Sequence, residues 1–316
     1  MIRLTFLGTA AARPTVGRGV SSIAVQREAD IALIDCGEGT QRQMMRYGSG
    51  FAVNRIFLTH IHADHFLGVV GLLRTLALQG REDPLHLYAP EGSSGVLRSA
   101  VRLGVERLPF EVPIHELQPE EKVHADGYAW EAFAVKHGTK ALGYALSEPD
   151  RLGRFDVDRA HELGVPAGRL FGRLHAGESI EVEGRVIHPD EVVGRPRPGR
   201  RVVFSGDTRP CRSTIQAATG ADVLVHEATF AAEETDRARQ TGHSTTVEAA
   251  EVAASAGVRQ LILTHISARY TDRPGTLERE ARVVFPGAVV AYDGLTLEVP
   301  FPDESLIPAQ GGSRSR

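Results

Sequence analysis

The stretch "FLTHIHADHF", residues 57–66, decides how this chain is interpreted. Three histidines and one aspartate, His60, His62, Asp64 and His65, fall within six positions, after an apolar run typical of a strand and before a helical pattern. Alternate residues of a strand share a face, so His60 and His62 can point together, and the helix start can aim Asp64 and His65 at the same place. Imidazole and carboxylate are good ligands for zinc and related metals.

A single tetrahedral ion cannot accept four ligands from one tight turn without strain. The spacing therefore favours two metals, with His60 and His62 on one and Asp64 and His65 on the other. A lone histidine would more often be a surface or capping residue, but this pattern after an apolar strand is far more specific.

Two metals need more ligands, which we expect at other strand ends. His137 in "AVKHGT", Asp207 in "FSGDTRP" and His265 in "LILTHIS" each follow an apolar run. Taken singly, Asp207 could equally cap a turn, and His265 could be a hydrogen-bonded core histidine. Together with the opening cluster, the three complete a set of seven ligands.

The rest of the chain alternates strands and helices. Strand-like runs are expected at 2–8, 21–26, 31–37, 55–60, 84–90, 201–207, 221–228, 260–266 and 288–294. Helices are expected at 64–78 and at about 247–256, the second with a capping box at Thr245 and Glu248. "FLTHI" at 57–61 is echoed by "ILTHI" at 262–266, which fits two related halves. These patterns predict a layered α/β architecture.

Residues 147–201 differ from the rest, with irregular patterning and many glycines and prolines. The part from 151 to 201 contains ten arginines and no lysine. It is too long for an ordinary loop and predicts either an insertion with its own function or a disordered segment. Its end, "RPRPGRR" (195–201), is either a basic contact for nucleic acid or a solvated hinge. The last residues, 303–316, are expected to be a disordered tail.

Composition excludes some classes of protein. The net charge of −4 argues against a chain that is basic throughout, although a local basic patch is still possible. No window is long and apolar enough for a membrane span, and the N-terminus lacks a signal-peptide pattern, so a cytoplasmic protein is expected. The two cysteines, Cys36 and Cys211, are expected to be thiols rather than a disulfide.

The motif H-x-H-x-D-H with a later His, Asp and His resembles the metallo-β-lactamase superfamily. Within it, the chain is similar to the ribonuclease Z family of tRNA 3′-processing endonucleases. The resemblance rests on "FLGTAAARPT" (6–15), "DCGEGTQRQ" (35–43), "THIHADHFLG" (59–68), "SGDTRPC" (205–211), "HEATF" (226–230), "TGHST" (241–245) and "LTHISARY" (263–270).

The resemblance implies an αββα sandwich made of residues 1–146 and 201–302, with 147–200 inserted as a flexible tRNA-binding arm. It also implies a homodimer that acts on precursor tRNA, with two zinc ions per subunit, although manganese or other divalent ions could replace zinc. The expected products are a tRNA with a 3′-hydroxyl after the discriminator base and a trailer with a 5′-phosphate.

Specific site residues follow from the same resemblance. One zinc would take His60, His62 and His137, the other Asp64, His65 and His265, with Asp207 bridging them. Asp64 would orient or deprotonate the attacking water, and Glu227 with His243 would form a pair that protonates the leaving oxygen. His243 could instead merely cap the helix near Val247.

Substrate contacts are expected from Arg18, Arg169 and Arg173. The segment "GVPAGRLFGRLHAG" (164–177) resembles the Gly- and Pro-rich motif of the family's arm, but Arg169 stands where a proline is expected. The family often has P-x-K-x-R-N near the N-terminus, and here Val16 and Gly19 depart from it. That departure leaves the handling of CCA-containing precursors open.

Two other functions fit parts of the sequence. The same fold and metals could serve a hydrolase of small phosphodiesters, sulfate esters or thioesters, although "HEATF", "TGHST" and the Arg-containing insertion argue against it. A catalytically dead RNA-binding or assembly protein is the other alternative, and the complete ligand set argues against that. A dinucleotide-binding interpretation of "DCGEGT" fails because the third glycine is missing.

Overall fold

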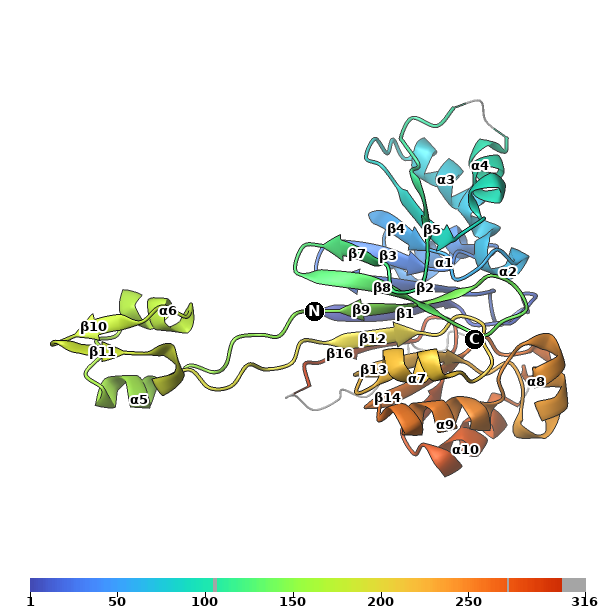
Figure 1. Ribbon diagram of the computed structural model, residues 1–316. Coiled ribbons are helices and arrows are strands. Elements are labelled where there is room, and N and C mark those ends of the chain that lie inside the picture. The colour runs from blue at the N-terminus through green and yellow to red at the C-terminus, as the bar shows by residue number, and fades with distance from the viewer. Residues whose placement is uncertain (105–106, 272, 303–316) are drawn as a thin grey trace. The chain divides into compact units, whose positions relative to one another are not determined.

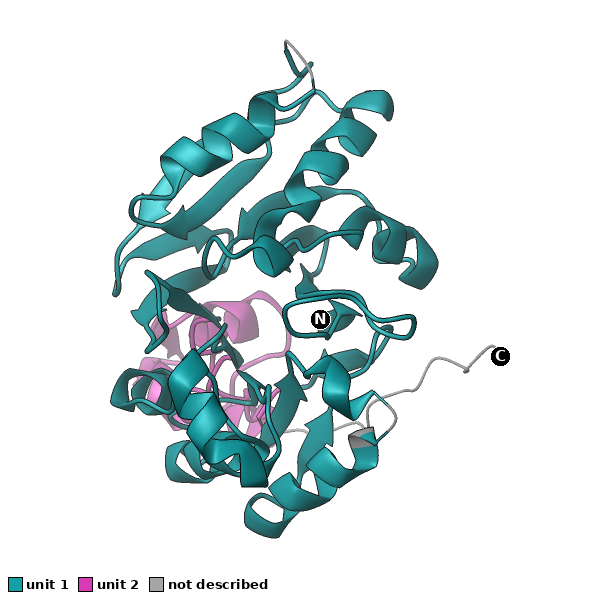
Figure 2. Ribbon diagram, turned by 90° about the vertical axis from the view of Figure 1, so that its right-hand side faces the viewer, with its two compact units in different colours: residues 1–147, 200–300, 305–316 teal, residues 148–199, 301–304 magenta. Residues whose placement is uncertain are grey.

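The computed structural model describes residues 1–104, 107–271 and 273–302, so the predicted tail at 303–316 lies outside the described residues. Two units make up the chain (Figure 2). The larger unit contains residues 1–147 and 200–300, and the smaller contains Glu148–Gly199 and a short segment that begins at Phe301.

The larger unit is built on two seven-stranded mixed sheets that pack face to face (Figure 1). The first sheet has the order β16-β1-β2-β3-β4-β5-β6, with β1 (Ile2–Gly8), β2 (Ser22–Arg27), β3 (Asp30–Ile34), β4 (Val53–Phe57), β5 (His86–Pro90), β6 (Ile114–Leu117) and β16 (Thr296–Val299). The second has the order β15-β14-β13-β12-β9-β8-β7, with β7 (Lys122–Ala125), β8 (Tyr128–Ala134), β9 (Leu142–Ser147), β12 (Arg201–Phe204), β13 (Val223–Glu227), β14 (Gln260–Thr264) and β15 (Ala288–Val290).

Helices cover the outer face of each sheet (Figure 1). Those on the first are α1 (Thr40–Tyr47), α2 (Ala63–Phe66), α3 (Gly68–Leu78) and α4 (Ser94–Arg102); those of the second half are α7 (Arg212–Ala218), α8 (Thr235–Thr241), α9 (Thr246–Ala256) and α10 (Pro274–Val284). The short 3-10 turns Ala232–Glu234 and Ala268–Tyr270 complete this half. The predicted αββα architecture is confirmed.

Three apolar clusters hold these layers together. The inner faces of both sheets share one core, centred on Phe57, Trp130, Tyr144 and Phe204. Each outer face has its own cluster beneath the helices. The parallel strands β13 and β14 are therefore buried on both faces, which explains why their centres are continuous apolar runs rather than alternating ones.

The sequence predicted the helix α9 with its ends. The Thr245 side chain accepts a hydrogen bond from the Glu248 N–H, the reciprocal bond is present, and Gly257 ends the helix in the left-handed region. The single helix predicted from 64 to 78 is wrong, because the chain divides it at Leu67. The Gly68 N–H leaves the helical ladder and donates to the Cys36 carbonyl at 2.9 Å.

A glycine is required at that division. A Cβ on Gly68 would lie 1.9 Å from the Gly37 carbonyl oxygen, so only glycine lets the two chains approach. This contact fixes the histidine-rich turn against the segment that follows β3 and accounts for the glycines at both positions, since a Cβ on Gly37 would lie 2.3 Å from the Asp64 carbonyl oxygen.

The smaller unit is a folded element with a core of its own. It contains α5 (Val157–Glu162), α6 (Arg169–His175), β10 (Ile180–Val182), β11 (Arg185–Ile187) and the 3-10 turn Pro189–Glu191. Buried side chains such as Leu174, Ile180 and Ile187 pack together at its centre. Within the described ranges, no helix has the length and apolar character that crossing a membrane requires.

Candidate metal centre

The predicted ligands meet at the carboxyl ends of strands from both sheets. His60 follows β4, Asp207 follows β12 and His265 follows β14, and each of these strands has a parallel neighbour. His137 follows β8, which runs in the same direction as β12 because both are antiparallel to β9. Carboxyl ends of parallel strands are common sites for ligands in such sheets.

The histidine-rich turn is arranged differently from the simple strand model. β4 ends at Phe57, so His60 and His62 are not alternate residues of a strand and that part of the prediction is wrong. The chain instead leaves the sheet in an extended segment up to His62, after which Asp64 and His65 begin α2. The imidazoles of His60 and His62 still converge, with 2.9 Å between Nε2 and Nδ1.

All seven predicted ligands come together in overlapping groups. His60, His62 and His137 form one cluster of donor atoms, and Asp64, His65 and His265 form another. Asp207 lies between them: its Oδ2 is 3.3 Å from His65 Nε2 and 3.8 Å from His60 Nε2. Four of these side chains, His60, His65, Asp207 and His265, are at most 3% exposed.

Hydrogen bonds on the outer side of the rings fix which imidazole nitrogen faces the centre. His65 Nδ1 lies 2.7 Å from Asp35 Oδ2, and His137 Nδ1 lies 3.0 Å from the Gly242 carbonyl. Both oxygens can only accept, so each Nδ1 carries the hydrogen. The Nε2 atoms of both rings therefore point inward, and in the neutral rings each has a free lone pair.

Thr59 fixes the ring of His60 in the same way. Its hydroxyl donates to the Asp35 carboxylate at 3.0 Å and can only accept from His60 Nδ1, 3.1 Å away. The inward nitrogens of the neutral His60 and His65 rings then face the Asp207 carboxylate, with 3.8 and 3.3 Å from Nε2 to Oδ2. Such a set is repulsive alone and is what a divalent cation stabilises, so the residues present fit one or more metal ions.

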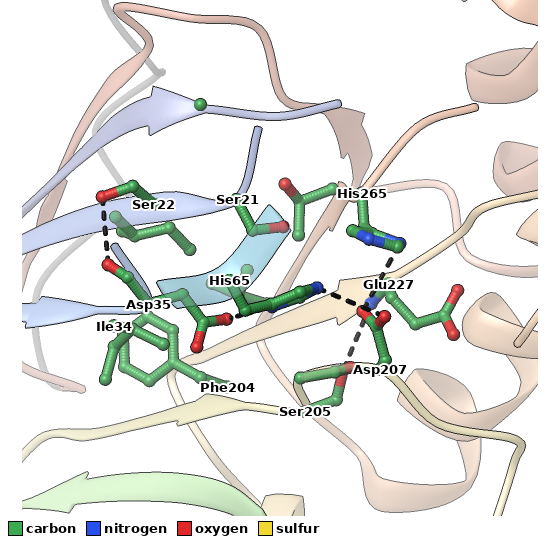
Figure 3. A pocket seen from close by; sticks show the side chains of 15 residues that line it. Ser21, Ser22, Ile34, Asp35, His65, Phe204, Ser205, Asp207, Glu227 and His265 are labelled. Atoms are coloured by element: carbon green, nitrogen blue, oxygen red, sulfur yellow. Dashed lines mark hydrogen bonds and ion pairs between the residues drawn. The ribbon is translucent and has the colours of Figure 1, made fainter. Parts of the chain in front are cut away.

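His65 gives the clearest sign of this. Its Nε2 is buried and, among the described residues, has no hydrogen-bond partner. Figure 3 shows the ring between Asp35 on one side and Asp207 on the other. A small cavity of about 30 Å³ lies beside these residues and is also lined by Ser205 and Glu227, whose side chains the same view shows.

The electrostatics of the centre favour bound cations. Burial and the neighbouring imidazoles lower the pKa of His60 to about 2, so this ring is neutral and ready to bind a metal. Burial would raise the pKa of Asp64 and Asp207, but the surrounding histidines lower both below the usual value. Burial also lowers the pKa of His65, yet Asp207 and Asp35 outweigh it and raise the value, so a metal ion would have to displace a proton from Nε2 of this ring.

Glu227 and His243 form the predicted pair beside the ligands. The Glu227 carboxylate is 1% exposed and accepts from His243 Nδ1 at 2.9 Å. Burial lowers the pKa of His243, but the bond to Glu227 outweighs it and raises the value to about 9. His243 therefore carries a proton at neutral pH. Its Nδ1 is also 3.8 Å from Asp207 Oδ2, so the pair borders the metal cluster.

The three predicted substrate arginines lie in different settings. Arg18 is 8% exposed and donates to Thr9 Oγ1 and to the Ala291 carbonyl, each at 2.6 Å, so its side chain supports the loop from inside. Arg169 begins α6 in the smaller unit and is exposed. Arg173, also exposed, pairs with Glu178 at 2.8 Å.

Sequence reasoning missed several supporting residues. Asp35 connects the two ligand groups, because it accepts from His65 and from Thr59, which in turn orients His60. Asp35 and His265 both have left-handed backbones, with φ of 57° and 56°, a strain that costs about 1–3 kcal/mol each in non-glycine residues. The "IALIDCG" run placed Asp35 at a strand end, which is the one signal that could have identified it.

A backbone group also reaches the ligands. The Ala12 N–H donates to Asp64 Oδ2 at 2.8 Å, and the preceding Ala11 N–H donates to the Ile266 carbonyl. The N-terminal loop is thereby attached to both sides of the second ligand group. No side-chain pattern in the sequence could have indicated this contact.

Comparison with known proteins agrees with this geometry. Residues 15–265 match the family model of the metallo-beta-lactamase superfamily. The chain is 53% identical to a protein named ribonuclease Z from Myxococcus xanthus over 305 residues, which are 96% of this chain and 99% of the relative. It is also 53% identical to a ribonuclease Z from Haloferax volcanii, covering 98% of this chain and 99% of that protein.

Solved structures give the same result. The short form of human tRNase Z superposes with a TM-score of 0.69 at 26% identity and covers 95% of this chain and 100% of its own. The metallo-beta-lactamase fold protein YhfI from Bacillus subtilis has a TM-score of 0.67 at 18% identity and covers 93% of this chain and 98% of its own. This likeness supports the fold alone.

Proposed function

The chain belongs to the ribonuclease Z family of the metallo-beta-lactamase superfamily and is an endoribonuclease of tRNA 3′ processing. We propose that it cuts precursor tRNA just after the discriminator base, and that two metal ions bind at the centre described above. The observation that carries the metal proposal is the set of histidine Nε2 atoms that face carboxylates at the centre, while acceptors on the outer side of the rings hold Nδ1.

Two groups of residues would bind the ions. His60, His62 and His137 would bind one, and Asp64, His65 and His265 the other. Asp207 would bridge them, because it lies within reach of both groups. We propose zinc, although manganese or another divalent ion would suit the same nitrogen and oxygen donors. Such a pair of ions supplies a nucleophilic hydroxide at neutral pH and neutralises charge on the phosphate.

The protein's own groups would move the protons. Asp64 would accept or orient a proton of the attacking water, with the Ala12 N–H fixing one carboxylate oxygen. His243, kept protonated by Glu227, would donate to the leaving 3′-oxygen of the tRNA. Hydrolysis then leaves a 3′-hydroxyl on the tRNA and a 5′-phosphate on the trailer.

Cleavage of one precursor tests the proposed function. A pre-tRNA without an encoded CCA should be cut by the metal-loaded protein at a single position, immediately 3′ of the discriminator base. Mapping both fragments to the nucleotide and determining their end groups measures this. Cleavage elsewhere, or hydrolysis of small phosphodiesters without any cleavage of pre-tRNA, would contradict the proposal.

We propose that the smaller unit, Glu148–Gly199, binds the tRNA backbone away from the chemistry. Arg169 is exposed at the start of α6, and no ion pair or hydrogen bond involves its side chain among the described residues. Arg173 has only a surface partner in Glu178, and such exposed pairs contribute little, about 0–1 kcal/mol. Both guanidiniums could therefore contact phosphates, which would give affinity without reading sequence.

Replacing residues 151–199 by a short Gly/Ser linker should weaken pre-tRNA binding and spare the chemistry. The buried Arg200, which donates to the Val299 carbonyl, is kept so that the larger unit is undisturbed. KM for pre-tRNA should rise. The plot of log binding affinity against log salt concentration should become less steep, by about one unit of slope for each phosphate that the protein no longer neutralises. Hydrolysis of a small phosphodiester is the control and should not change. An unaltered KM for pre-tRNA would refute the role of this unit.

The family resemblance also supports a homodimer, in which the smaller unit of one subunit serves the metal centre of the other. We further propose that the protein works in the cytoplasm, where its tRNA substrates are found. Both cysteines are free thiols, as expected in a reducing compartment.

A further inference from the structure

The Glu227 carboxylate is bound by Thr229 as well as by His243, and Thr229 has no part in the mechanism proposed above. Its Oε1 accepts from His243 Nδ1 and from the Thr208 N–H. Its Oε2 accepts from the Thr229 N–H at 3.0 Å and from the Thr229 hydroxyl at 2.8 Å. Four donors therefore fix this buried carboxylate, and Thr229 provides two of them.

The Thr229 hydroxyl also reaches a predicted metal ligand. Its oxygen lies 2.9 Å from His265 Nδ1. The hydroxyl has a single hydrogen, which it donates to Glu227, so toward His265 it can only accept. His265 must then carry its hydrogen on Nδ1, and its Nε2, 3.3 Å from Asp64 Oδ2, is left with a bare lone pair facing the centre.

We propose that Thr229 is a positioning residue that presents Nε2 of His265 to the metal and ties this ligand to the Glu227–His243 pair. The proposal rests on the proposed function, since it requires His265 to bind a metal. One carboxylate then serves two purposes: directly it orients the proton donor, and through Thr229 it orients a ligand. Hydrogen-bond partners of ligating histidines typically contribute about 10–100-fold in metal affinity.

Loss of the hydroxyl would leave His265 Nδ1 close to a different acceptor, Asp207 Oδ1, which is 3.4 Å away. A hydrogen bond to it would turn the ring and engage the carboxylate that is proposed to bridge the ions. Removing the Thr229 hydroxyl is therefore expected to disturb both His265 and Asp207. Removing a hydroxyl that only fills space would not have this effect.

Three variants of the full-length protein test the proposal. Thr229→Val removes the hydroxyl but keeps the shape and the N–H, whereas Thr229→Ser keeps the hydroxyl. Thr214→Val is a matched control, because Thr214 is also fully buried but its hydroxyl lies beside Cys211 Sγ, at 3.1 Å, and outside the ligand groups. Metal-free protein is titrated with Zn²⁺ alone against a chromogenic chelator, which measures the affinity of each equivalent without activity.

The expected result is a loss of about 10–100-fold in affinity for one Zn²⁺ equivalent in Thr229→Val, with Thr229→Ser and Thr214→Val close to wild type. With pre-tRNA, Thr229→Val should lose kcat at limiting Zn²⁺ and keep KM. Wild-type affinity in Thr229→Val would overturn the proposal, as would an equal loss in Thr214→Val or a failure of serine to rescue. If wild-type protein binds two Zn²⁺ but does not cut pre-tRNA, the proposed function fails while this inference is still decided by the titration.

Discussion

Asp207→Ala is expected to lose both metal ions and all detectable cleavage of pre-tRNA. Asp207 is 3% exposed, and its carboxylate contacts His65 and His265, with His60 slightly farther away. No other described carboxylate lies between the two ligand groups in this way. Without the Asp207 carboxylate, two cations would be bound only by the imidazoles and the single carboxylate of Asp64. Metal analysis of the purified variant together with single-turnover cleavage measures the effect.

Asp222→Asn is the matched control for Asp207→Ala. Asp222 is equally buried, at 2% exposure, but it accepts from the Arg201 N–H and from Arg259 and takes no part in the ligand groups. The Asp222→Asn protein should keep both metal ions even if it unfolds at a lower temperature. If Asp207→Ala retains wild-type metal content and rate, Asp207 is not the bridge.

His243→Ala is expected to keep both metals and pre-tRNA binding but to lose about 10²–10⁴-fold in kcat, the usual contribution of a general acid. The defect should shrink for a substrate that releases p-nitrophenolate, because that leaving group needs no proton. His124→Ala, an exposed histidine on β7, serves as the control. Equal losses on both substrates, or loss of a metal ion, would show that His243 has another role, such as that of a ligand with Asp207 and His265.

The same assignment makes two further measurements informative. The cationic form of His243 is the active one, so kcat should fall as pH rises through its pKa of about 9, and this alkaline limb should vanish in His243→Ala. Glu227→Gln should show a milder defect than His243→Ala, and the double variant should be far from additive, since the two residues act as a unit. Additive losses would separate their roles.

Much of the fold and the ligand set could be predicted from the sequence because both depend on local patterns. Apolar runs that end in polar residues predicted β4, β12 and β14. The periodicities also predicted α9 with both ends. Such patterns can be recognised in one sequence because burial on both faces of a strand and capping of a helix each require particular residue types at fixed spacings.

Boundaries and bends were less predictable. Nothing in the periodicity of residues 64–78 indicates a break at Leu67, because the break is caused by Gly68 meeting Gly37 from a segment 31 positions earlier in the chain. Similarly, Arg18 carries a charge that suggests an exposed contact, yet the loop folds its guanidinium inward onto Thr9 and Ala291.

The sequence by itself determined which chemical groups are available: five histidines and two aspartates at strand and helix ends, a Glu–His pair in short polar motifs, and an arginine-containing insertion. Only the tertiary structure decided how the groups are used. Which imidazole nitrogen faces the centre depends on an acceptor supplied by a distant segment: Asp35 for His65, Gly242 for His137 and Thr229 for His265. A hydrogen bond is directional and short-ranged, so its partner is fixed by packing in three dimensions and not by spacing along the chain.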